Sequence, residues 1–150
     1  MMRKIDLETT LGTTIFLTAK SLERASEYRI KEKLGLTPSQ WKIILTLSFF
    51  NGISQKELAG KIYVDASTLV PVIDKMEIGG LVERKPDPND RRNNLVFLTK
   101  KSESAVDSII KILLQLIKEF YKGISQKEQD NIQILLKKIM DNADNTLNKK

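Results

Sequence analysis

Apolar side chains recur every three or four positions along most of this chain, which is the period of amphipathic α-helices. The first such stretch covers residue 5 to about residue 33 and ends before Gly35. Residues 37–40 then read Thr-Pro-Ser-Gln, a capping box with proline at the first helical position. A second helix is therefore predicted to begin there and to end at the Asn-Gly pair of residues 51–52.

The next segment predicts two helices joined by a tight turn. Residues 54–57 read Ser-Gln-Lys-Glu, a second capping box, and open a helix of about two turns. Asp65 is the expected N-cap of the following helix, which ends at the glycine pair 79–80. Its apolar spacing predicts an inward face of Leu69, Val72, Ile73 and Met76. Only residues 63 and 64 separate the two helices, which is typical of a helix-turn-helix unit.

After residue 80 the pattern changes from a helical period to short strands. Residues 81–85 and 94–98 are strand candidates, and the polar segment 86–93 between them is rich in turn residues. The simplest interpretation is a β-hairpin with a charged tip. Thr99 is expected to cap a fifth helix, and a third capping box at residues 125–128 begins a last one.

This order of helix, short helix, turn, helix and β-hairpin is that of a winged helix-turn-helix. We therefore expect a mainly α fold with a small β-hairpin wing, flanked by N- and C-terminal helices. The chain has 150 residues, enough for one domain with a sizeable core. The terminal helices carry more apolar surface than a winged lobe can cover, which favours an interface between copies.

In a winged helix-turn-helix the second helix of the turn enters the DNA major groove. The inward face predicted above leaves six outward positions, Ser67, Thr68, Val70, Pro71, Asp74 and Lys75. Small polar and apolar side chains of this kind suit base edges and thymine methyl groups. Pro71 is unusual because proline removes the hydrogen bond to the Ser67 carbonyl, a cost expected to be smaller near a helix N-terminus.

The net charge of the chain indicates a class of binding partner. The chain carries 25 Lys and Arg against 19 Asp and Glu, a net +6, which suits a polyanion such as nucleic acid or an anionic membrane. Residues 84–101 hold six cations and two anions, so +4 of that charge lies in the hairpin region. Arginines at a loop tip can reach a minor groove, and Asp90 can pair with Arg91 or Arg92 and orient the other. The alternative is that this basic loop is simply solvated.

Missing residue types exclude several chemistries. The chain has no cysteine and no histidine, so it has no disulfides, no thiolate or imidazole metal ligands and no catalytic dyads built on these groups. We expect no metal, no cofactor and no enzymatic activity. The longest apolar run, residues 43–50, is too short to span a membrane, and the N-terminal residues lack a signal peptide's apolar region. A cytoplasmic protein is the simplest expectation.

Several motifs together resemble the MarR family of transcriptional regulators. They are Leu-Thr-Pro-Ser-Gln-Trp at 36–41, Ser-Gln-Lys-Glu-Leu-Ala at 54–59, the recognition-helix stretch 67–77, Gly-Leu-Val-Glu-Arg at 80–84, Asp-Pro-Asn-Asp-Arg-Arg at 87–92 and Leu-Thr at 98–99. The resemblance extends over essentially the whole chain. It implies dimerisation helices at about 1–35 and 100–150, and a DNA-binding lobe at about 36–99.

The same resemblance implies a homodimer that binds a pseudo-palindromic operator, and a repressor role. It assigns Ser67, Thr68, Val70, Pro71 and Lys75 to the major groove. It assigns Arg92, steadied by Asp90 and beside Arg91, to the minor groove, and Ser54, Gln55 and Arg84 to the surroundings of phosphates.

A small anionic or phenolic effector is also implied, between the terminal helices and the winged lobe. Lys20, Arg24 and Tyr28 share one face of the first helix, and Trp41 begins the second, so a cation beside an aromatic ring could hold a carboxylate. The plainer interpretation is that Trp41 is core and the cations are solvated. Family members that sense peroxide through cysteine or metals through histidine differ from this chain, which lacks both residues.

A second hypothesis is a winged-helix scaffold that binds protein partners without reading DNA sequence. Steep sequence specificity would distinguish the two, because a scaffold lacks it. An enzyme using paired carboxylates has no supporting motif.

Overall fold

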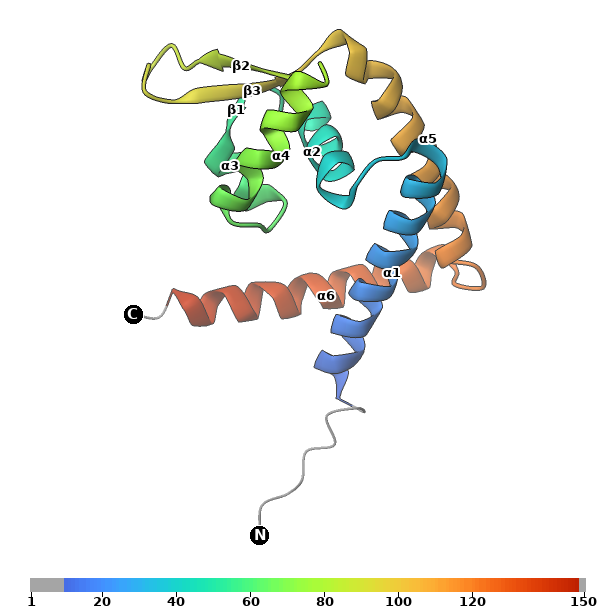
Figure 1. Cartoon of the computed structure of the whole chain (residues 1–150). Helices are drawn as coiled ribbons and strands as arrows, with labels where there is room; N and C mark the ends of the chain where they lie inside the picture. The colour runs from blue at the N-terminus through green and yellow to red at the C-terminus, as the bar shows by residue number, and fades with distance from the viewer. Residues whose placement is uncertain (1–9, 149–150) are drawn as a thin grey trace. The chain divides into compact units, whose positions relative to one another are not determined.

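The computed structural model describes residues 10–148 (Figure 1). In chain order these residues form α1 (Leu11–Leu34), α2 (Pro38–Phe49), β1 (Ile53–Ser54), α3 (Gln55–Lys61), α4 (Ala66–Ile78), β2 (Val82–Pro86), β3 (Asn94–Leu98), the 3-10 turn η1 (Lys100–Ser102), α5 (Glu103–Phe120) and α6 (Gln126–Leu147). The architecture is the mainly helical winged helix-turn-helix predicted from the sequence. The first helix begins at Leu11, later than the predicted residue 5, because the Thr10 side chain caps it by accepting from the Thr13 N–H. Residues 5–9 of the prediction lie outside the described residues.

Helix starts agree closely with the sequence signals. At Thr37, Ser54 and Ser125 the cap side chain accepts from the backbone N–H three residues on, and the Gln or Glu there accepts from the cap's own N–H. All three predicted capping boxes are confirmed. Asp65 occupies the N-cap of α4 as expected, but its side chain makes no capping hydrogen bond.

Thr99 differs from its predicted role. It precedes η1 rather than starting α5 directly, and its side chain forms no cap. Its hydroxyl instead donates to the Gly80 carbonyl at 2.5 Å, and the Ser102 hydroxyl donates to the Leu81 carbonyl. The two carbonyl acceptors lie 19 and 21 residues away in sequence, so no local pattern identifies them.

The wing is a three-stranded antiparallel sheet in the order β1-β3-β2. The predicted hairpin is confirmed, with Val82 opposite Leu98 and Pro86 opposite Asn94. The third strand, β1, was not predicted, because two residues are too few to show a strand period. β1 pairs with β3 because the chain passes close to Phe97 at Gly52. Gly52 has a φ of 76°, and a Cβ atom there would lie 2.5 Å from the Phe97 ring, so glycine is required.

The described chain divides after Leu114 into two compact units. In the first, α2, α3, α4 and the sheet enclose one apolar core, to which α1 adds Ile30 and α5 adds Ile109. Leu69, Ile73 and Met76 of α4 are buried in it and Val72 is half-buried, as predicted. They share it with Leu58 of α3 and with Val82 and Val96 of the sheet, so α4 is fixed with its opposite face outward.

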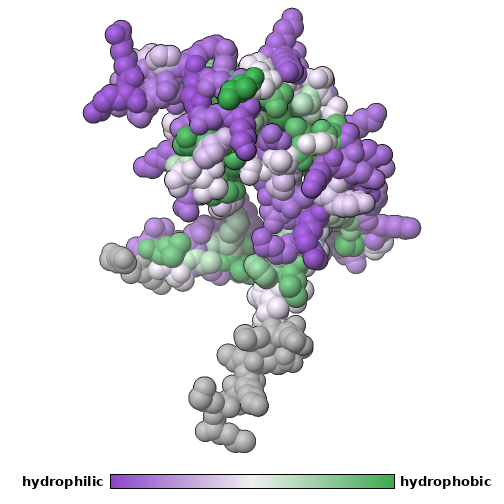
Figure 2. Space-filling model, in the orientation of Figure 1, coloured by the Kyte–Doolittle hydropathy of each residue, from purple (hydrophilic) through white to green (hydrophobic). Residues whose placement is uncertain are grey.

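The second unit contains the end of α5 and all of α6. No residue of α6 is buried, although it carries an apolar stripe. The exposed side chains of that stripe are Ile132, Leu135, Leu136, Ile139 and Met140. Hydrophobic surface is visible along this helix in Figure 2. Within residues 10–148 no helix is both long and apolar enough to cross a bilayer.

Candidate nucleic-acid interface

The outward face of α4 is open along its length. Every predicted outward position is exposed, namely Ser67, Thr68, Val70, Pro71, Asp74 and Lys75. The first four lie in the N-terminal half of the helix, the half that meets base edges in a helix-turn-helix. Burial of the opposite face in the core therefore leaves an exposed surface of two hydroxyls, two apolar groups, a carboxylate and a lysine.

Pro71 lies beyond the first turn of α4. The helix begins at Ala66, which makes Pro71 its sixth residue, and the ladder has already started where the Leu69 N–H donates to Asp65 at 3.3 Å. The reduced cost expected near a helix start therefore does not apply, because only the first turn lacks intrahelical partners. The Ser67 carbonyl loses a donor at the reading face.

The wing tip presents a fixed arginine. Asp90 accepts two hydrogen bonds from the Arg92 guanidinium, from Nε at 3.0 Å and from a terminal nitrogen at 3.1 Å, and a third from the Arg92 backbone N–H. The hydrogen bond from the Arg92 side chain holds the pKa of Asp90 below its usual range, and the same contact raises the pKa of Arg92. Arg91 beside it is exposed, and the tip is among the most hydrophilic surface in Figure 2.

Arg84 has a different environment in β2. Its guanidinium donates to Gln55 of α3 at 2.9 Å, and to Glu77 and Asp74 of α4, each at 2.7 Å. Its backbone N–H also donates to Glu77 at 3.0 Å. Arg84 therefore connects the wing to both helices of the helix-turn-helix, and we refer to Arg84, Gln55, Asp74 and Glu77 as the wing clamp.

The remaining predicted phosphate neighbours also make internal contacts. Ser54 is engaged in its capping box with Glu57, whose pKa the backbone and hydroxyl of Ser54 lower. The side-chain oxygen of Gln55 is held by Arg84. The structure thus brings Gln55 and Arg84 together, and it places both beside α4 rather than at the wing tip.

The predicted effector residues do not form one cluster. Trp41 is buried in the core, and its indole N–H has no hydrogen-bond partner within the described residues. Lys20, Arg24 and Tyr28 are exposed on α1, and Lys20 donates to Glu23 at 3.0 Å.

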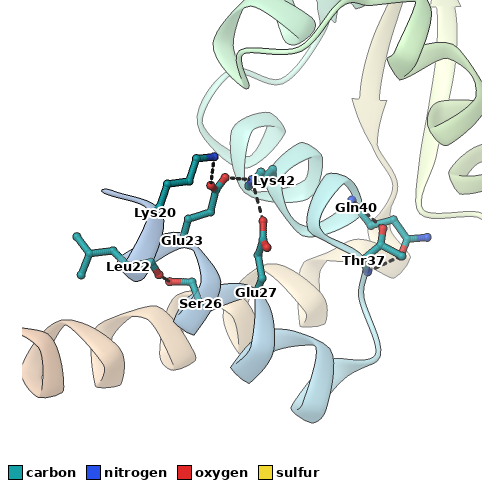
Figure 3. Close-up of polar contacts among 8 residues, drawn as sticks. All are labelled: Lys20, Leu22, Glu23, Ser26, Glu27, Thr37, Gln40 and Lys42. Carbon is teal, nitrogen blue, oxygen red and sulfur yellow. Dashed lines mark hydrogen bonds and ion pairs between the residues drawn. The ribbon is translucent and has the colours of Figure 1, made fainter. Parts of the chain in front are cut away.

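Lys42 of α2 connects α1 to α2, a role that no sequence motif indicates (Figure 3). It donates to Glu23 at 2.5 Å and to Glu27 at 3.2 Å. The hydrogen bond from Lys42 is the main reason that the pKa of Glu23 is lowered, with Lys20 adding to it. Burial alone would lower the pKa of Lys42, but the two carboxylates outweigh it and raise the pKa. These three residues tie the first helix to the winged lobe.

The wing clamp and the Lys42 cluster were both missed. Glu23 and Glu27 lie one helical turn apart, as do Asp74 and Glu77 approximately, and such spacings indicate paired carboxylates on one helix face. No local pattern identifies the cation that joins them from another element.

Comparisons with known proteins agree with this geometry. A family model described as "MarR family" matches residues 36–93, the winged lobe. The multiple antibiotic resistance protein MarR of Escherichia coli is 30% identical over 132 residues, covering 87% of this chain and 90% of that protein. The HTH-type transcriptional regulator SarZ of Staphylococcus haemolyticus is 29% identical over 128 residues, 85% of each protein.

The fold is matched as well. The crystal structure of a mutant MarR from E. coli complexed with operator DNA superimposes with a TM-score of 0.76 at 28% identity, over 86% of this chain and 92% of that one. Family, relatives and fold therefore agree with the exposed α4 face and the charged wing. The chain belongs to the MarR family of winged helix-turn-helix, DNA-binding transcriptional regulators, a family without enzymatic activity.

Proposed function

We propose that this protein is a homodimeric repressor that binds a pseudo-palindromic operator. The observation that carries the proposal is the exposed face of α4 combined with the Asp90-oriented Arg92 in the same lobe, which supplies one element for each groove. The similar MarR structure holds operator DNA, which supports the same partner here. We place its action in the cytoplasm.

The residue roles follow from this arrangement. Ser67, Thr68, Val70, Pro71 and Lys75 face the major groove, and Arg91 and Arg92, with Asp90, face the minor groove. Ser54, Gln55 and Arg84 lie along the phosphate-facing edge of the lobe. Because Arg84 and Gln55 already bond each other and α4, we assign them to positioning of the wing rather than to direct phosphate contact.

The dimer uses the terminal helices. The apolar side chains of α6 and the exposed Leu11, Phe16 and Leu17 of α1 lack cover in a single chain. Apolar surfaces of this kind are most often covered by a second copy of the same chain in a symmetric homodimer. We propose a division into dimerisation helices at about 1–35 and 100–150, and a DNA-binding lobe at about 36–99.

The proposed effector is a small anionic or phenolic compound bound near Lys20, Arg24, Tyr28 and Trp41. Trp41 is the sole tryptophan, and its unpartnered indole N–H can donate to a ligand oxygen if the site opens. Titration with a hydroxybenzoate should change Trp41 fluorescence and weaken DNA binding together. A fluorescence change without weaker DNA binding would contradict an effector role.

The proposal is tested by selecting bound duplexes from a random DNA pool with the full-length protein, at stated salt. The expected result is a two-fold symmetric motif whose half-sites are centred about 10 bp apart. Enrichment of no motif, with binding equally tight to all sequences, would favour the alternative of a winged-helix scaffold. Affinities measured across a salt series separate sequence readout from the phosphate contribution.

A further inference from the structure

The turn between α3 and α4 contains a backbone conformation that its residue type disfavours. Tyr63 has a φ of 58° and is the only non-glycine residue with positive φ among residues 10–148. The Val64 N–H donates to the Ala59 carbonyl at 3.0 Å, a helix C-cap pattern in which glycine or asparagine usually occupies the left-handed position. Tyrosine is strained there because its Cβ crowds the backbone.

No contact among residues 10–148 offsets this strain. The Tyr63 side chain is 94% exposed, and no hydrogen bond or ring contact to its phenol occurs in the described part of the chain. The ring adds nothing to the core, and glycine would adopt the turn at lower cost. Strained residues persist where they serve a site, which points to a partner outside the chain.

The position of Tyr63 indicates which partner. A hollow of about 600 Å³ lies between the end of α3 and the start of α4, and it is lined by Ala59, Gly60, Tyr63, Val64, Asp65 and Thr68. Thr68 belongs to the proposed reading face of α4. A DNA strand positioned at Thr68 therefore passes the Tyr63 ring as well.

Charge limits the geometry of this contact. Asp65 also lines the hollow, and its carboxylate disfavours a phosphate inside it. A phosphate must then be met at the rim, where a long side chain with a terminal hydroxyl can reach it. Tyrosine hydroxyls are among the groups that bind phosphates in protein–DNA complexes.

We propose that the Tyr63 hydroxyl donates a hydrogen bond to a phosphate oxygen of the DNA backbone in each half-site. The inference rests on the proposed function and adds a backbone contact to it. Such a contact positions the protein on the duplex and carries no sequence information.

The test compares full-length Tyr63→Phe and Tyr63→Gly variants on duplexes selected by the wild type and on random duplex. Tyr63→Phe should lose about tenfold in affinity on both, because a hydrogen bond to a charged group is removed. Tyr63→Gly should lose at least as much, while its urea midpoint should not fall, because glycine relieves the strained turn. Ile78→Ala is the matched control, since Ile78 is 88% exposed at the far end of α4, and its affinity should be unchanged.

A neutral methylphosphonate placed at each phosphate in turn identifies the contact. At one position per half-site the difference between wild type and Tyr63→Phe should disappear, because the two changes remove the same interaction. Wild-type affinity in Tyr63→Phe, or a difference that persists at every phosphate, would overturn the inference.

Failure of this inference differs from failure of the proposed function. If Arg92→Ala weakens binding and Tyr63→Phe does not, only the Tyr63 contact is wrong. If the wild type selects no motif, the proposed function is wrong, and Tyr63→Phe on random duplex still tests the hydroxyl.

Discussion

Two arginines eight residues apart in the wing hairpin have opposite surroundings. The Arg84 side chain is 17% exposed and bonded to three side chains, whereas that of Arg92 is 90% exposed and bonded to Asp90 alone. Removal of Arg84 should therefore affect the fold, and removal of Arg92 should affect binding.

Arg92→Ala should weaken operator binding by about 1–3 kcal/mol and reduce the magnitude of the salt slope, because a cation that displaces counterions is lost. The urea midpoint should not change, since this side chain packs on nothing. Affinities measured over a salt series check both statements. An Arg92→Ala protein with wild-type affinity throughout that series would remove Arg92 from the DNA contacts.

Arg84→Ala should lower the free energy of unfolding by about 1–2 kcal/mol. The change leaves Asp74 and Glu77 without their cation, and partial solvent exposure of the two carboxylates keeps the loss below that of a fully buried pair. Operator affinity should fall as well, because the wing is no longer held against α4. Urea unfolding checks this, with Lys111→Ala on the exposed side of α5 as the control, and equal midpoints for the two variants would contradict a clamp.

The Lys42 cluster predicts a pH dependence. The Lys42 hydrogen bond lowers the pKa of Glu23 in the folded state, so its stabilisation is present above the ordinary value of 4.5 and is lost as the pH falls through the lowered pKa. The stability difference between wild type and Glu23→Gln should be constant near neutral pH and shrink below pH 4.5. Urea midpoints over that range check the prediction, and Glu32→Gln on the same helix provides the comparison. A difference that stays constant down to acid pH would contradict it.

At the scale of elements, α4 both packs in the core and presents the candidate DNA-binding face. Its buried face fixes its orientation through Leu69, Ile73 and Met76, and its other face remains free to meet DNA. Pro71, on the free side, removes one backbone hydrogen bond of the helix. Sequence preference should therefore depend on the exposed residues and folding on the buried ones.

Replacing Thr68 or Val70 by alanine should shift base preference at defined positions of each half-site, by about 1–3 kcal/mol per mismatch. Lys75→Ala distinguishes two roles, because a uniform loss over all sequences indicates a phosphate and a position-specific loss indicates guanine. Selection from a random pool with each variant checks this. An unaltered motif in all three variants would mean that α4 does not read DNA.

For the whole molecule, the uncovered apolar surface is the dominant feature. The winged lobe shares a buried core with α1 and α5, whereas α6 has no buried residue. Helical stripes of this kind are stable in water only when another surface covers them.

We therefore expect a dimer without a stable folded monomer. Sedimentation at micromolar concentration should give twice the chain mass of 17.1 kDa. Leu135→Asp should dissociate or unfold the protein, because it places a charge on the stripe, whereas the exposed Lys137→Asp should not. A folded wild-type species of 17.1 kDa would contradict the prediction of a dimer without a stable monomer.

Local sequence determined most element boundaries and the candidate reading face. Capping boxes, glycine stops and apolar periods act within four residues, so Thr37, Ser54, Ser125 and Gly35 could be assigned correctly without tertiary information. The pairing of Asp90 with Arg92 is also local, since the two residues are two positions apart, and it is confirmed.

Tertiary structure alone decided the contacts between distant residues. The strand β1 exists because β3 lies beside it, and Thr99 binds Gly80 in preference to capping a helix. The sequence predicted that Arg84 lies near a DNA phosphate, whereas in the folded chain its guanidinium donates to three side chains. These are Asp74, Glu77 and Gln55. Charge and hydrogen-bonding capacity are properties of a residue and can be read from sequence. Which partner satisfies them depends on distances in the folded chain, and the energy of a polar group depends on that partner.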